Sequence, residues 1–108
     1  MARVEVFLTE DAEADLSEID EFIEFHDSAE RADAVFDKLK ESIQKLDSLP
    51  GRGRIVPELR EVGVKEYREI DNKPYRVLYF VSGGKVIVHG IFDGRRGIDE
   101  LLSHRLLR

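Results

Sequence analysis

The spacing of apolar residues changes once along this chain, and that change limits the folds it can adopt. In the first half, apolar residues recur every three or four positions, from Ala12 to Ile23 and again from Ala32 to Leu46. This period places each set on one face of a helix. From Tyr67 onward the period is two, as expected for strands. A helical first half followed by a stranded second half is typical of the α+β class.

The helical half opens with one strand. The segment VEVFLT (4–9) alternates and is rich in β-branched residues, which favours a strand. Thr9 is then a helix N-cap, and Asp27 or Ser28 is the N-cap of the second helix. Two helices joined by two or three residues form an antiparallel hairpin.

Pro50 and Gly51 end the second helix. The stretch up to Val64 is predicted to be an ordered loop with a short turn near PELREVG (57–63). The Gly83–Gly84 pair predicts a tight hairpin turn between the last two strands. The strands are predicted at YREI (67–70), PYRVLYFV (74–81) and KVIVHGIF (85–92).

A short helix after Gly97 completes the order β-α-α-β-β-β-α. We therefore predict an α+β fold in which a helical hairpin packs on a small antiparallel sheet. With 108 residues, the chain is long enough for one domain, 1–108, and one core.

Charge is distributed unevenly along the chain. Residues 1–50 carry 5 Lys and Arg against 15 Asp and Glu, a net charge of −10, whereas residues 51–108 carry 12 against 8, a net charge of +4. The total of −6 argues against nonspecific binding of nucleic acid by the whole protein, but the second half alone does not.

Several classes of site and location are excluded or not expected. The chain has no cysteine, which excludes a disulfide framework and a thiolate nucleophile. His26, His89 and His104 are too far apart in sequence to form a local metal motif. No apolar run has the length of a membrane span or the features of a signal peptide, so we expect a cytoplasmic protein.

Arg76 lies inside an apolar strand, where it alternates with Leu78 and Phe80. A buried guanidinium needs a partner. It either forms a structural ion pair with Glu69 or Asp93, or presents a fork suited to phosphate or carboxylate.

Other basic residues surround this strand. Arg68 lies on the neighbouring strand, and Arg95 and Arg96 follow an Asp-Gly turn where the last strand ends. These two are either solvated or project over the same surface as Arg76.

The remaining candidates are in the last strand and the last helix. His89 is predicted to be structural, and His104 is a candidate proton-transfer group. Arg105 and Arg108 are interpreted as ordinary cations at a helix C-terminus.

Five segments, taken in order, resemble the RelE/ParE family of type II toxins. They are LTEDAEADLSEIDEFI (8–23), LDSLPGRGR (46–54), GVKEYREI (63–70), YRVLYFVSGGKVIVHGIFDGRR (75–96) and RLLR (105–108). The resemblance covers the chain from about Val4 to Arg108. It implies the fold predicted above and a growth-inhibiting toxin that an antitoxin neutralises within a hetero-oligomer, without a cofactor.

The resemblance assigns different roles for two targets. RelE-like members cleave mRNA in the ribosomal A site, and Arg76 and Arg96 match arginines that contact the scissile phosphate. Arg68 stands at a catalytic lysine position, and His104 lies near the position of a family tyrosine. ParE-like members poison DNA gyrase, and Arg76, Arg95 and Arg96 are then the candidate target contacts.

Two observations favour the ParE-like branch. The helical hairpin is long, and the second lysine position of the RNase branch holds Ile70 while its tyrosine position falls near Leu102. A metal-independent, RelE-like endoribonuclease is the alternative. A degenerate toxin that only binds its antitoxin is a further alternative.

Overall fold

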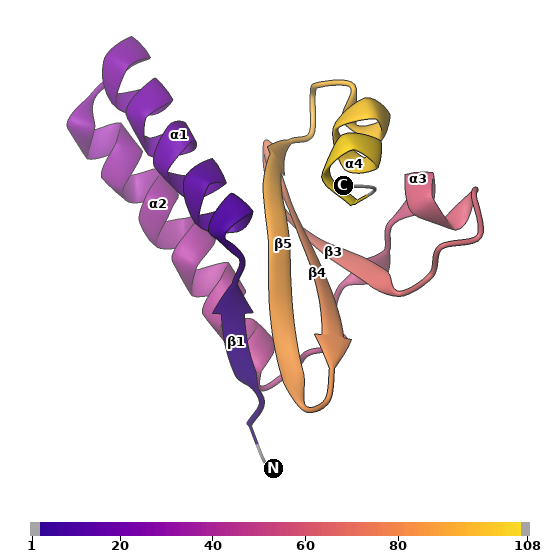
Figure 1. Ribbon diagram of the computed structural model, residues 1–108. Helices are drawn as coiled ribbons and strands as arrows, with labels where there is room; N and C mark the ends of the chain where they lie inside the picture. Colours follow the sequence, from indigo (N-terminus) through magenta and orange to yellow (C-terminus); the bar gives the residue numbers. More distant parts are fainter. Residues whose placement is uncertain (1–2, 107–108) are drawn as a thin grey trace.

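The computed structural model describes residues 3–106, which form a five-stranded sheet with helices on both faces (Figure 1). A single turn of 3₁₀ helix, η1, follows the second helix. In chain order the elements are β1 (Glu5–Leu8), α1 (Glu10–His26), α2 (Ala29–Gln44), η1 (Lys45–Asp47), β2 (Arg54–Ile55), α3 (Pro57–Arg60), β3 (Tyr67–Asn72), β4 (Tyr75–Ser82), β5 (Lys85–Asp93) and α4 (Ile98–Leu106).

A hydroxyl side chain caps the N-terminus of each long helix. The hydroxyl of Thr9 accepts a hydrogen bond from the backbone N–H of Ala12 at 3.1 Å. The hydroxyl of Ser28 accepts one from the N–H of Arg31 at 3.0 Å. These N–H groups have no partner inside the helix, so each hydroxyl fixes the point at which its helix begins. The predicted helical hairpin is confirmed, and Ser28 rather than Asp27 is the second cap.

The sheet is mixed rather than wholly antiparallel. Its strand order is β1-β5-β4-β3-β2, and β1 runs parallel to β5 while every other pair is antiparallel. A parallel pair needs a long connection between its strands, and here the helical hairpin and three strands lie between them. The α+β class and the packing of the hairpin on the sheet are as predicted.

The segment predicted as a loop contains two short elements. The two-residue strand β2 extends the sheet at the edge of β3, pairing Arg54 with Glu69 and Ile55 with Arg68. The helix α3 follows, with Pro57 in its first turn, where proline is well tolerated. Both elements are too short to give a periodic pattern in the sequence.

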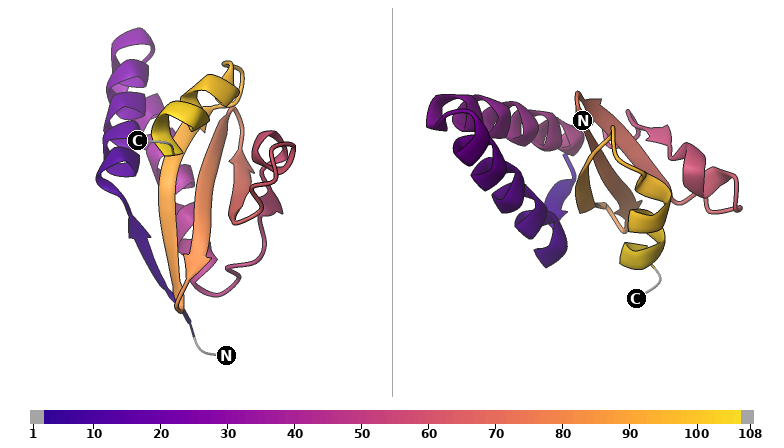
Figure 2. Two further views of the ribbon diagram at one scale, coloured as in Figure 1. Left: turned by 45° about the vertical axis from the view of Figure 1, so that its right-hand side comes forward. Right: turned by 90° about the horizontal axis from the view of Figure 1, so that it is seen from above.

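Apolar side chains form a core on each face of the sheet. The larger core joins the hairpin to the sheet through residues such as Leu39, Ile43 and Tyr79. The smaller core lies on the other face, where Leu102 of α4 meets Leu78 and neighbouring side chains. Figure 2 shows the hairpin on one side of the sheet and α3 and α4 on the other. Residues at the end of the sheet therefore have helices on both sides of them.

None of the helices within residues 3–106 has both the length and the apolar character needed to cross a membrane.

Candidate functional site

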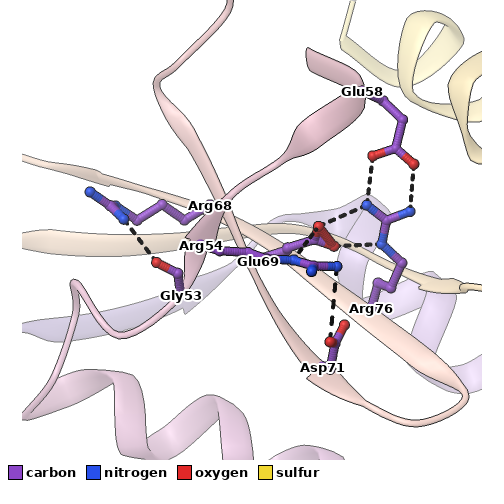
Figure 3. A network of polar contacts seen from close by, with 7 residues as sticks. All are labelled: Gly53, Arg54, Glu58, Arg68, Glu69, Asp71 and Arg76. Carbon is purple, nitrogen blue, oxygen red and sulfur yellow. Dashed lines mark hydrogen bonds and ion pairs between the residues drawn. The ribbon is translucent and has the colours of Figure 1, made fainter. Parts of the chain in front are cut away.

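Arg76 of β4 is largely buried and bound to two carboxylates. Its two terminal nitrogens donate to Glu58 of α3, both at 2.8 Å. Its Nε and Nη2 donate to Glu69 of β3, the second at 2.8 Å (Figure 3). Only 13% of the Arg76 side chain is exposed. The predicted pair with Glu69 is confirmed, whereas Asp93 is bound elsewhere and Glu58 was not foreseen.

Two further residues complete what we call the Arg76 network, which consists of Arg54, Glu58, Glu69, Asp71 and Arg76. Arg54 binds Glu69 at 3.3 Å and lies 4.0 Å from Asp71. The hydrogen bonds from Arg76 lower the pKa of Glu58, and those to Glu58 and Glu69 raise the pKa of Arg76. Glu58 and Glu69 thus already accept four hydrogen bonds from the Arg76 guanidinium.

Arg68 does not join this network. Adjacent residues of a strand point to opposite faces of the sheet. Arg68 therefore points away from the side chain of Glu69 and from Arg76, to which Glu69 is hydrogen-bonded (Figure 3). Its guanidinium donates to the carbonyl of Gly53 at 2.8 Å. The same glycine donates its N–H to the Tyr79 hydroxyl at 2.9 Å. In the structure Arg68 therefore holds the loop that precedes β2.

Arg95 and Arg96 are exposed in the turn that follows β5. Arg95 donates two hydrogen bonds to the carboxylate of Asp93, from its Nε at 3.0 Å and from its Nη2 at 2.7 Å. These bonds lower the pKa of Asp93. Among the described residues, the guanidinium of Arg96 has no hydrogen bond or ion pair. It is thus available to a ligand.

A cleft of about 630 Å³ lies between α1 and this turn, and we call it the α1–turn cleft. Acidic and apolar side chains of α1 form one wall, the arginines of the turn form the other, and the sheet forms the floor. Arg76 lies outside this cleft, under α3, so the strand-end arginines do not share its surface. The lining residues are Asp15, Glu18, Ile19, Phe22, Tyr75, Ile91, Phe92, Asp93, Arg95, Arg96 and Arg105.

Arg105 is not the ordinary helix-end cation that we predicted. Its terminal nitrogens bind Asp15 of α1 at 3.0 and 3.1 Å and the carbonyl of His89 at 3.1 Å. This carbonyl lies one residue beyond Val88, the last residue of β5 paired with β1, and it also accepts a hydrogen bond from the Thr9 hydroxyl at 3.4 Å. Arg105 therefore ties α4 to the hairpin. A signal existed in the sequence, since Arg105 continues the helical spacing of the buried Ile98 and Leu102.

The histidines occupy less specialised positions. His104 is exposed on α4, next to Arg105 but on the outside of the helix. The ring of His89 lies 5.8 Å from the rings of both Tyr67 and Phe80, in an aromatic cluster. Within residues 3–106, no three His, Asp or Glu side chains are placed to hold a metal ion. Arg108 lies outside the described residues.

The four residues assigned to the RNase branch do not converge. Arg76 lies beneath α3 and Arg68 faces the opposite side of the sheet. Arg96 lines the α1–turn cleft, and His104 is exposed on α4. These four residues therefore do not form a single cluster that could surround one reacting phosphate.

Comparison with known proteins identifies relatives of this fold. A sequence model of the ParE toxin of type II toxin–antitoxin systems (parDE) matches residues 6–98. A chain of the chromosomal ParDE toxin–antitoxin system from P. aeruginosa has a TM-score of 0.71 and 19% identity, over 84% of this chain and 96% of that one. A chain of the RelBE2 toxin–antitoxin complex from Mycobacterium tuberculosis has a TM-score of 0.59 and 21% identity, over 86% and 93% respectively. No curated protein sequence matches.

Proposed function

Because the chain belongs to the ParE toxin family of type II toxin–antitoxin systems, we propose that it inhibits growth by poisoning DNA gyrase. The toxin acts in the cytoplasm and is neutralised by a cognate antitoxin in a hetero-oligomer. Both structural relatives described above were solved as toxin–antitoxin systems, which supports an antitoxin partner for this chain.

The occupied guanidinium of Arg76 is the observation that favours gyrase over RNA as the target. An RNase of this family type needs a cation that meets the developing charge on the phosphate. Here Glu58 and Glu69 already take four hydrogen bonds from Arg76. A phosphate placed there meets two carboxylates instead of a free fork. This supports the ParE-like function over a ribosome-dependent endoribonuclease.

Arg95 and Arg96 are the residues that we assign to target contact. Both are exposed on the turn that follows β5, where Arg95 forms an ion pair with Asp93. Arginine is enriched among the residues that dominate protein–protein binding energy. We assign Arg76, the third candidate from the sequence, to positioning α3 instead.

A supercoiling assay with purified gyrase, relaxed plasmid and ATP tests the proposal. We expect the toxin to inhibit supercoiling and to leave linear DNA after detergent and protease treatment. The Arg95→Ala/Arg96→Ala variant should lose this effect, whereas Arg60→Ala, an exposed arginine on α3, should retain it. Normal supercoiling at high toxin excess would overturn the proposal.

A second measurement in cells separates the two targets. After induction of the toxin, a DNA-damage reporter should respond before protein synthesis falls. Codon-positioned cuts in translated mRNA, with no damage response, would instead identify the RelE-like activity. An absence of toxicity without the antitoxin would identify a degenerate toxin.

A further inference from the structure

The last two turns of α1 carry aromatic side chains that the fold leaves in contact with water. Phe25 is 85% exposed and Phe22 is 62% exposed. The ring of His26 contacts both, with its centroid 4.2 Å from that of Phe22 and 5.0 Å from that of Phe25. We call these three residues the aromatic tip. Figure 1 shows this end of the helical hairpin projecting beyond the end of the sheet.

α1 packs on the sheet through a different set of residues. That set consists of Ala12, Leu16, Ile19 and Ile23. The three residues of the aromatic tip follow the i, i+3, i+4 spacing, so they form one continuous patch beside it. A contiguous apolar patch on the surface of a soluble protein marks an interaction site. Aromatic side chains are also enriched in the centres of protein–protein interfaces.

The surroundings of the aromatic tip are strongly acidic. Between Arg3 and Arg31 the chain has 11 Asp and Glu and no Lys or Arg. The exposed acids at the end of α1 and the start of α2 are Glu21, Glu24, Asp27 and Glu30. These charges repel a nucleic acid, and they also repel the same patch on a second copy of the chain. The occupant that fits is a basic protein surface with apolar side chains at its centre.

We propose that the aromatic tip is a second contact with gyrase, additional to Arg95 and Arg96 of the turn. The rings of Phe22 and Phe25 pack on apolar side chains of the enzyme, and the surrounding carboxylates face its Lys and Arg. An enzyme that binds DNA carries such basic side chains, because they hold the phosphates. Phe22 lines the α1–turn cleft together with Arg96, so one partner can contact the tip and the turn at the same time.

Gyrase is the partner both here and in the proposed function, so the inference rests on that function. It adds a contact of opposite charge, since the turn presents arginines and the tip presents carboxylates. Two contacts that require opposite charges on the enzyme fix the orientation in which the toxin binds.

Binding of the purified toxin to immobilised gyrase holoenzyme, measured by bio-layer interferometry, tests the aromatic contact. Phe25→Ala should raise the Kd by roughly tenfold, as expected for an aromatic residue at the centre of an interface. Phe7→Ala is the matched control, because Phe7 is also exposed, at 42%, but lies on β1. Its Kd should stay within about twofold of wild type. Circular dichroism melts check that both variants are folded.

Charge reversal tests the acidic surroundings. Glu21 lies one helical turn before Phe25, and Glu21→Lys should raise the Kd by roughly fivefold at low salt. The Kd of this variant should also depend less on salt than that of wild type. Glu61→Lys is the same change at an exposed position at the end of α3, and it should leave both quantities unaltered.

The outcomes separate this inference from the proposed function. If wild-type toxin binds and inhibits gyrase and both tip variants bind equally well, the second contact is wrong and the function stands. If wild-type toxin neither binds nor inhibits gyrase, the function fails and the second contact fails with it. Loss of antitoxin co-purification in Phe25→Ala, with gyrase binding unaltered, would assign the tip to the antitoxin. A toxin dimer that Phe25→Ala abolishes, again with gyrase binding unaltered, would assign it to self-association.

Discussion

Arg76 and Arg96 belong to the same end of the sheet but lie in different chemical environments. Arg76 is paired across the ladder with Phe92, and only three residues separate Phe92 from Arg96. Yet Arg76 is 13% exposed and bound to two carboxylates, whereas Arg96 is exposed and unbound among the described residues. A charge inside a covered strand must be paired to be tolerated, and a charge just beyond the strand end need not be. The comparison separates a structural arginine from one available for recognition.

Removal of Arg76 should have the largest effect on stability. Arg76→Ala leaves Glu69, which is 2% exposed, without its main partner. Loss of one member of a buried pair costs about 3–5 kcal/mol in the free energy of unfolding. Urea denaturation followed by circular dichroism measures this cost.

Arg54→Ala is the matched control for that variant. Arg54 binds the same carboxylate but is 61% exposed, so its loss should cost below about 1 kcal/mol. An Arg76→Ala variant with wild-type stability and lost toxicity would reverse our assignment, because Arg76 would then be a target contact.

A methyl group at position 53 should have the next largest effect. A Cβ on Gly53 would lie 2.6 Å from both the carbonyl oxygen of Glu69 and the hydroxyl of Tyr79. Gly53→Ala should therefore lower the free energy of unfolding by about 1–3 kcal/mol. Gly51→Ala is the control, since nothing lies within 4 Å of its Cβ. Equal melting temperatures for the two variants would show that the loop held by Arg68 adapts freely.

Acid should weaken the Arg76 network through Glu58. Hydrogen bonds from Arg76 lower the pKa of Glu58 from its ordinary value of 4.5. A lowered pKa contributes stability that is complete above 4.5 and disappears as the pH falls through the folded value. Glu58→Gln should therefore be less stable than wild type at pH 7, and the difference should shrink below pH 4.5. Urea midpoints measured from about pH 7 to pH 3 check this, and parallel pH profiles would contradict it.

The exposed turn should give the smallest effect on stability. Arg95→Ala/Arg96→Ala changes exposed residues and should alter the free energy of unfolding by about 0.5 kcal/mol or less. The same variant should lose toxicity in a growth assay. A large loss of stability would mean that the Arg95–Asp93 pair holds the end of β5, and the contrast with Arg76 would fail.

Local features of the fold could be predicted because neighbouring residues determine them. The caps Thr9 and Ser28 act on N–H groups three positions away. Gly83 and Gly84 adopt positive φ values of 55° and 76° in their turn, which glycine adopts readily. The Arg76–Glu69 pair was foreseen because both residues lie on strands joined by a short turn.

Contacts between distant segments could not be predicted in the same way. Asp15 and Arg105 are 90 positions apart, and their ion pair depends on how α4 folds back onto α1. Glu58 reaches Arg76 only because α3 folds over the sheet, and four residues of helix leave no periodic signal. The α1–turn cleft is formed by segments that are distant in sequence, so only some of its lining residues could be predicted from the sequence.

The parallel pairing of β1 with β5 also has a consequence for how the toxin is made. The sheet joins the start of the chain to its end: Thr9 and His89, 80 positions apart, are hydrogen-bonded. During synthesis β1 and the hairpin emerge before their partners in β5 and α4. Contacts of such long sequence separation form late in folding. The α1–turn cleft therefore cannot form until β5, the following turn and α4 have all been made.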